Sequence, residues 1–143
     1  MNPWLQELEQ LYSDALEKIK LAAADRRFGE GILGIGRKMS DEPCHMELLN
    51  GVKKRMEEMG QAATSQEARE AIRYVCERPE CYQSVEASIY WTMLCAHGQT
   101  VAAIPRLNAQ DAVELYNWYQ KAYPKRTRLP IQNNVVKALK NQI

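Results

Sequence analysis

The segment between Cys81 and Pro105 constrains the fold most, because Glu86 is its only formally charged residue. Apolar side chains occupy both faces of a helix built from it: Val85, Ile89, Met93, Trp91 and Leu94. A helix that is apolar nearly all round is normally buried inside a protein. Polar residues interrupt the run, which falls short of the roughly 20 apolar residues that a membrane-spanning helix needs. We therefore expect a central buried helix over about 81–97 and no membrane association.

Residues that start helices are spread through the rest of the chain. Asn2 followed by a proline is typical of a helix N-terminus, since the asparagine side chain accepts from N–H groups that would otherwise be unpaired. Thr64 with Glu67, and Asn108 with Asp111, stand three residues apart as in a capping box, where each side chain accepts from the other's backbone N–H. No segment alternates apolar and polar residues as a half-buried strand does.

Apolar residues recur at helical spacing between these signals, which predicts six helices. They are expected over about residues 3–27, 40–60, 64–78, 81–97, 108–122 and 130–139, with a glycine-rich loop over 28–39 and a short turn at 100–104. The chain has 143 residues, of which 45% are apolar and 26% charged, as is typical of one globular domain. The prediction is therefore an all-α fold, a single domain over 1–143 in which about six helices surround the central apolar helix.

The glycine-rich segment contains the literal pattern G-x-G-x-x-G from Gly29 to Gly34. This pattern binds dinucleotides only where a strand leads into the glycine turn and a helix follows directly. Here a long helix precedes the pattern and the next helix-start signal comes only at Ser40. Gly31 to Gly36 is also a near miss for a phosphate-binding loop, without the lysine and the hydroxyl residue that the motif needs. We expect no cofactor.

Cysteine and histidine residues fall into three groups: Cys44 and His45, Cys76 and Cys81, and Cys95 and His97. Four such ligands suffice for a structural zinc site. Adjacent residues on a helix diverge by about 100°, and residues two apart by about 200°, so neither pair that contains a histidine offers both ligands to one ion. Free cysteine commonly packs as a small hydrophobe. We expect no metal site, and the sequence leaves open whether folding brings these groups together.

Glu86 is expected to form an ion pair, because a charge on a buried helix needs a partner. An arginine is expected to supply it: Arg69, Arg73 or Arg106. If Glu86 instead lies with Cys44, His45 and His97 around one cavity, the protein is a helical enzyme or binds a small ligand.

The first residues lack a basic stretch followed by an apolar one, so no secretory signal is expected. Four cysteines without such a signal predict reduced thiols and a cytoplasmic protein.

The formal charge of the chain is divided between its two ends. Residues 1–114 contain 13 basic and 18 acidic residues, whereas residues 115–143 contain six basic residues and none that is acidic. The six are Lys121, Lys125, Arg126, Arg128, Lys137 and Lys140. On the helix over 109–122, Trp118 points away from the apolar face and stands beside Lys121. This combination predicts an aromatic and basic surface that binds a partner.

We therefore expect a non-catalytic module that binds a macromolecular partner through Trp118 and the six basic residues. The partner is predicted to be a protein, with a second copy of this chain as one candidate. The alternative from another class is sequence-tolerant binding of nucleic acid through the same surface, in which the cations contact phosphates and Trp118 stacks on bases.

Overall fold

The computed structural model describes residues 1–32, 42–81 and 87–143, and every regular element within them is helical. The six α-helices are α1 (Pro3–Ile32), α2 (Glu42–Ala62), α3 (Ser65–Cys81), α4 (Ala87–Cys95), α5 (Ala109–Ala122) and α6 (Pro130–Gln142). Three short 3₁₀ segments connect them: η1 (Ala96–Ala102), η2 (Ile104–Arg106) and η3 (Lys125–Thr127). The predicted all-α bundle of about six helices is confirmed.

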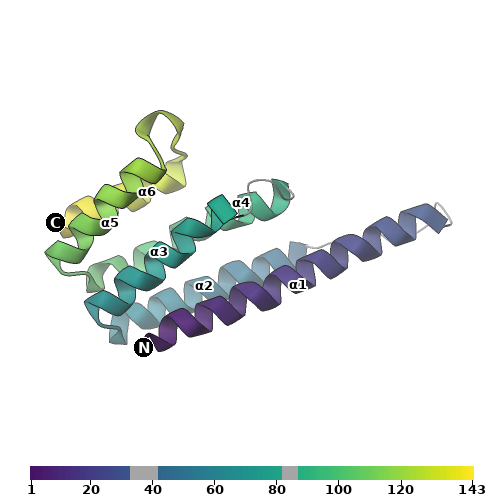
Figure 1. The fold of residues 1–143 in the computed structure, drawn as a ribbon, viewed down its shortest axis with the longest axis horizontal. Coiled ribbons are helices and arrows are strands. Elements are labelled where there is room, and N and C mark those ends of the chain that lie inside the picture. Colours follow the sequence, from purple (N-terminus) through teal and green to yellow (C-terminus); the bar gives the residue numbers. More distant parts are fainter. Residues whose placement is uncertain (33–41, 82–86) are drawn as a thin grey trace.

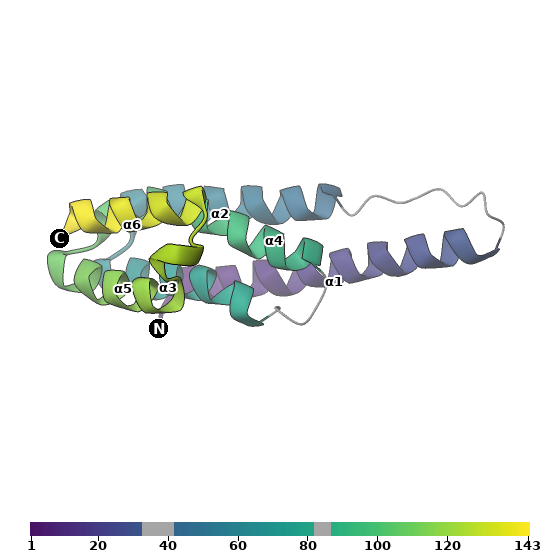
Figure 2. The same ribbon diagram turned by 90° about the horizontal axis from the view of Figure 1, so that it is seen from above.

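The longest helices, α1 and α2, lie side by side and antiparallel (Figure 1). Helices α3 and α4 cover one side of this pair, and α5 and α6 form an antiparallel hairpin farther out (Figures 1 and 2). The C-terminal half of α1 projects beyond the other helices (Figure 2). The two ends of the chain lie at the same end of the bundle, opposite this projection (Figure 2).

The helix starts follow the local signals in the sequence. The side-chain oxygen of Asn2 accepts hydrogen bonds from the backbone N–H groups of Trp4 and Leu5, at 3.1 and 3.2 Å. Thr64 and Glu67 form both bonds of the predicted capping box. The side chain of Asn108 accepts from the N–H of Asp111 at 2.8 Å, as a cap of α5. The Asn2 cap and the Thr64–Glu67 capping box are confirmed, because each depends only on residues within one turn. The box predicted at Asn108 forms only one of its two bonds, because the N–H of Asn108 donates to the hydroxyl of Ser65 in α3.

Several helix ends differ from the predictions. Helix α1 continues through Ile32, so the first part of the expected loop is helical, while residues 33–39 lie outside the described residues. Helix α3 continues past Pro79 to Cys81, although a proline was expected to end it. A glycine or proline weakens a helix by about 1 or 3 kcal/mol, and burial of neighbouring residues outweighs such costs. Pro79 is itself buried, so its ring contributes to that packing.

The apolar segment lies at the centre of the fold, as predicted, but as two elements. Helix α4 ends at Cys95, and the chain tightens into η1, which contains Gly98 instead of stopping there. Segment η1 packs against α2, α3, α4 and α6, and its Ala96, His97 and Thr100 are fully buried. The hydroxyl of Thr100 donates to the carbonyl of His97 at 2.7 Å, which satisfies one carbonyl of this tight turn.

One hydrophobic core joins all the helices. Its fully buried large side chains come from α1, α2, α3, α4, η2, α5 and α6: Tyr12, Leu8, Ile19, Leu48, Met56, Met59, Ile72, Ile89, Met93, Ile104, Tyr119 and Leu139. None of the described helices is long and apolar enough to cross a membrane.

Helix α5 is fixed to α3 by polar contacts at the edge of this core. The hydroxyl of Ser65 donates to Asp111 and accepts from the N–H of Asn108. The guanidinium of Arg69 lies 3.0 Å from the carboxylate of Asp111 and 2.7 Å from that of Glu114. The α5–α6 hairpin therefore has a defined position relative to α3.

Candidate functional site

Five of the six C-terminal basic residues are exposed, and Arg128 is half-buried. Lys121 lies in the last turn of α5, Lys125 and Arg126 lie in η3, and Arg128 follows in extended conformation before α6. Among the described residues, none of the six forms an ion pair with a carboxylate. We call these six residues the basic surface.

Arginines elsewhere in the described chain are engaged within the fold. Arg55 contacts Glu7, Arg69 contacts Asp111 and Glu114, and Arg73 contacts Glu77 at 2.6 Å. Arg106 donates to the carbonyl of Ala63 at 2.8 Å. Among the described residues, the basic surface is therefore distinguished by the grouping of its cations and not by their lack of carboxylate partners, which the exposed Lys53 and Lys54 of α2 share. Glu86, the expected partner of Arg69, Arg73 or Arg106, lies outside the described residues.

Trp118 occupies a different environment from the one its helical position suggested. It is half-buried against the core, and its ring forms edge-to-face contacts with Tyr119 and Tyr123. The guanidinium of Arg73 lies over the indole, 4.9 Å from the ring centre. Trp118 therefore contributes to the contact between α3 and α5, and helix α3 covers the side that was expected to face solvent.

An aromatic pocket of about 320 Å³ lies on the inner side of the segment 121–128. Its walls come from α3, α4, the α5–α6 connection and α6: Glu80, Tyr90, Trp91, Leu94, Ala122, Tyr123, Thr127, Leu129 and Gln132. The side chain of Trp91 is 53% exposed, which is unusual for an indole in a bundle of this size. We call this the aromatic pocket. Glu80 is the charged residue in its lining, whereas Lys121, Lys125, Arg126 and Arg128 belong to the same chain segment as Ala122, Tyr123, Thr127 and Leu129 but do not line it.

The remaining two cations lie farther away along α6. Lys137 and Lys140 follow Pro130 by seven and ten residues, which corresponds to about 10 and 15 Å along a helix axis. Both are exposed, while Gln132, Val135 and Leu139 face the core. The structure thus divides the basic surface into a group of four at the end of α5 and in the α5–α6 connection, and a pair on the outer face of α6.

Hydrogen bonds hold the pocket wall in place. The hydroxyl of Tyr123 donates to the carbonyl of Cys76 in α3. The side chain of Gln132 accepts from the N–H of Leu129 at 2.9 Å, and this bond fixes the start of α6. At the other end of α6, the side chain of Gln142 donates to the carbonyls of Pro105 and Leu107 at 3.2 and 2.9 Å. The pocket is therefore built on fixed elements of the bundle.

A buried polar cluster lies behind this wall. The Nδ1 atom of His97 is 2.8 Å from the hydroxyl of Tyr119, and the histidine ring also packs edge-on against Tyr123. Burial lowers the pKa of His97 to about 4, and the backbone of Cys76 offsets only a small part of this effect. Burial also raises the pKa of the Cys76 thiol and of both tyrosine hydroxyls well above their usual values. All four groups are therefore neutral at pH 7, and the cluster is structural.

The other cysteine and histidine residues do not join this cluster. His45 lies 2.6 Å from the hydroxyl of Thr92 through its Nδ1 atom, on the interface between α2 and α4. Cys81 is exposed, whereas Cys44 and Cys95 are half-buried. Within residues 1–32, 42–81 and 87–143, no three potential ligands come close enough to hold a metal ion. His45 and His97 have separate partners, so the described members of the expected set do not share one reactive cavity.

Thiol labelling tests this arrangement of the cysteines. In the native protein we expect Ellman's reagent to modify Cys81 rapidly and Cys76 only after unfolding, because Cys76 is fully buried and burial raises the pKa of its thiol. The Cys81→Ser variant should lose the fast phase. Rapid labelling of Cys76 in native Cys81→Ser protein would contradict the described packing of α3.

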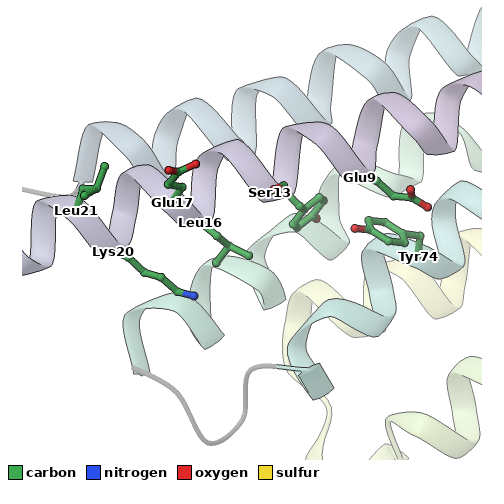
Figure 3. A pocket seen from close by; sticks show the side chains of 8 residues that line it. Glu9, Ser13, Leu16, Glu17, Lys20, Leu21 and Tyr74 are labelled. Atoms are coloured by element: carbon green, nitrogen blue, oxygen red, sulfur yellow. The ribbon is translucent and has the colours of Figure 1, made fainter.

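A larger pocket of about 450 Å³ lies on α1. Figure 3 shows its wall, in which Glu9, Ser13, Leu16, Glu17, Lys20 and Leu21 come from α1 and Tyr74 comes from α3. Its charged side chains are exposed to solvent, and the guanidinium of Arg78 stacks on the ring of Tyr74 at 3.8 Å. The lining groups therefore do not converge as reactive groups in a catalytic site do.

Comparison with models of protein families, with curated proteins and with solved structures finds no match for this chain.

Proposed function

We propose that this protein is a non-catalytic binding module, and that its basic surface and aromatic pocket together bind an acidic segment of a partner protein. The observation that carries the proposal is an exposed tryptophan, Trp91, in a pocket that is also lined by Thr127 and Leu129, which belong to the same chain segment as Lys125, Arg126 and Arg128. Tryptophan and arginine are the residues that most often contribute strongly to protein interfaces. A group of basic side chains also attracts an acidic partner and raises its association rate.

The shape of the site favours a peptide over nucleic acid. A pocket of about 320 Å³ with aromatic and leucine walls accommodates one or two apolar side chains, which a peptide offers next to its carboxylates. Binding of single-stranded nucleic acid uses a track of cations with aromatic rings free for stacking. Here Arg73 covers Trp118, and Lys137 and Lys140 stand apart from the other cations. Binding of nucleic acid remains the outcome that would replace this proposal.

We place this binding event in the cytoplasm. All four cysteines are free, including the exposed Cys81, which fits a reducing compartment. A second copy of the chain is one candidate for the partner, because residues 1–114 carry an excess of acidic residues.

Charge reversal at Lys125 and Arg126 tests the proposal. A labelled peptide of alternating glutamate and leucine is titrated in fluorescence anisotropy with wild-type protein and with the Lys125→Glu, Arg126→Glu double variant. We expect affinity to fall about tenfold or more, since the variant replaces two attractive charge contacts by repulsive ones, each worth a few tenths to 1 kcal/mol. Both residues are exposed, so the helical content should not change.

The matched control reverses two exposed lysines of α2, Lys53→Glu and Lys54→Glu, which changes the net charge equally. An equal loss of affinity in this control would show that net charge alone governs binding, and would contradict the proposed site. Competition by a single-stranded oligonucleotide, with binding that weakens by orders of magnitude between 50 and 200 mM salt, would support the nucleic-acid alternative. Sedimentation of the protein alone at increasing concentration tests the second copy as partner.

A further inference from the structure

The aromatic pocket combines three aromatic side chains with one carboxylate. Tyr90 and Trp91 of α4 contribute two of the rings, and Tyr123 after α5 contributes the third. Glu80 of α3 is the charged residue in the lining. The face of an aromatic ring is the negative side of its quadrupole, and the carboxylate adds a full negative charge. This composition favours a cation inside the pocket.

Three of these side chains lie close together. Burial and the nearby thiol of Cys76 raise the pKa of the Tyr123 hydroxyl above its usual value. The carboxylate of Glu80 and the hydroxyl of Tyr90 raise it further, which requires both groups to lie near Tyr123. The Tyr123 hydroxyl is held in place because it donates to the carbonyl of Cys76. Glu80, Tyr90 and Tyr123 therefore form one corner of the pocket.

No cation of the described chain neutralises this corner. Glu80 is exposed and, among the described residues, takes part in no ion pair, although a neighbouring segment of the lining contains four basic residues. Within the same residues, no lysine or arginine lies over the ring of Tyr90, Trp91 or Tyr123. The carboxylate and the exposed indole of Trp91 are thus both accessible to a ligand.

The protein contains the same combination of groups elsewhere, with an arginine in place. Between α3 and α5, the guanidinium of Arg73 lies 4.9 Å from the ring centre of Trp118 and pairs with Glu77 at 2.6 Å. Arg78 lies over the ring of Tyr74 at 3.8 Å. Arginine suits such sites, because its planar guanidinium stacks on a ring while its N–H groups donate to a carboxylate.

We propose that the aromatic pocket binds an arginine side chain of the partner segment, whose guanidinium stacks on Trp91 and pairs with Glu80. This inference rests on the proposed function, because it names the side chain that enters the pocket when the acidic segment binds. The apolar stem of the arginine lies against the leucine walls. Carboxylates on either side of the arginine face the exposed Lys125 and Arg126.

The basic surface is compatible with an arginine in the pocket. Lys121, Lys125 and Arg126 are exposed and do not line the pocket, so salt screens their repulsion of the guanidinium. The contacts with Glu80 and Trp91 act at short range and are screened less. Because Glu80 is itself exposed, each contact contributes modestly, and we expect a preference for arginine of about fivefold.

Three labelled peptides measure this preference by fluorescence anisotropy. All have the alternating glutamate and leucine sequence, and one central leucine is kept, replaced by arginine or replaced by citrulline. Citrulline has the shape of arginine without its charge. Wild-type protein is expected to bind the arginine peptide about fivefold more tightly than the citrulline peptide, as one exposed ion pair and one cation–π contact together provide.

Two variants locate the contact in the pocket. Glu80→Gln and Trp91→Leu should each lower the preference for arginine over citrulline about twofold, and the double variant should abolish it. Both residues are exposed, so the helical content should not change. Glu57→Gln removes an exposed carboxylate of α2 and is the matched control, with an unchanged preference.

The outcomes separate this inference from the proposed function. Equal affinity of wild-type protein for the arginine and citrulline peptides would overturn the inference, and the basic surface would stand. A preference that survives in the Glu80→Gln, Trp91→Leu double variant, or that falls equally in Glu57→Gln, would also overturn it. If wild-type protein binds none of the three peptides even at low salt, the proposed function fails, and the inference fails with it.

Discussion

Lowering the pH from about 6.5 to 4 is expected to reduce the free energy of unfolding by about 3 kcal/mol through His97 alone. Burial holds the pKa of this histidine at about 4 in the native state, against 6.5 for an ordinary histidine. Below pH 6.5 the unfolded chain binds a proton that the native state does not bind. The unfolded state therefore gains stability until the pH reaches the native pKa, below which both states are protonated and the loss is complete.

Chemical unfolding at pH 7, 5.5 and 4 measures this loss. The titratable groups in contact with His97 are Cys76, Tyr119 and Tyr123, and none of them changes charge in this range, because burial raises the pKa of all three. Exposed carboxylates also make the free energy of unfolding depend on pH. The decisive quantity is therefore the difference in this pH dependence between wild-type protein and His97→Asn. Asparagine keeps a polar group near the Tyr119 hydroxyl but does not titrate. An identical slope in wild-type protein and His97→Asn would show that His97 is not the group responsible.

Gly60→Ala is expected to reduce the free energy of unfolding by about 2 kcal/mol, although alanine is the better helix former. A Cβ atom at Gly60 would stand 2.6 Å from the carbonyl oxygen of Ala102, which is closer than van der Waals contact allows. This oxygen belongs to the backbone of η1 and cannot move without displacing the centre of the fold. Urea unfolding at neutral pH measures the effect.

Two other glycines provide controls for this substitution. A Cβ at Gly98 meets only the side chain of Ile131, at 3.8 Å, so Gly98→Ala should be neutral or stabilise by about 0.5 kcal/mol. At Gly51 the Cβ would overlap the methyl groups of Leu11 at 2.8 Å, but a side chain can rotate away. We therefore expect an intermediate cost for Gly51→Ala. Equal stability of Gly60→Ala and Gly98→Ala would contradict the close contact between α2 and η1.

The sequence predicted helix starts better than helix ends. Asn2, Thr64 and Asn108 act through hydrogen bonds to residues two or three positions away, so the sequence alone contains the whole interaction. Helix ends depend on whether tertiary contacts offset a local cost. Pro79 was expected to end α3, yet it is buried within the helix. Gly98 was expected to follow a helix, yet it lies within the buried segment η1.

The candidate site was predictable only in part. The excess of cations in residues 115–143 follows from the sequence, and the exposure of Lys121, Lys137 and Lys140 agrees with their positions on the outer faces of α5 and α6. The sequence did not predict which tryptophan is exposed. The helical position of Trp118 predicts an outward side chain, but Arg73 of α3 lies over its ring. Trp91 lies in the most apolar segment, which predicts burial, yet the residue is 53% exposed.

The sequence by itself determined the helical class of the fold, its central apolar segment and the charge difference between its ends, because periodicity, caps and formal charge are local properties. Only the tertiary structure decided that the apolar segment divides into α4 and η1, and that His97 is buried next to Tyr119. It alone brought Trp91 of α4 together with Tyr123 and Leu129 of the α5–α6 connection in one pocket. The physical reason is that burial and pairing depend on which helices lie against each other, and those contacts join residues far apart in the chain.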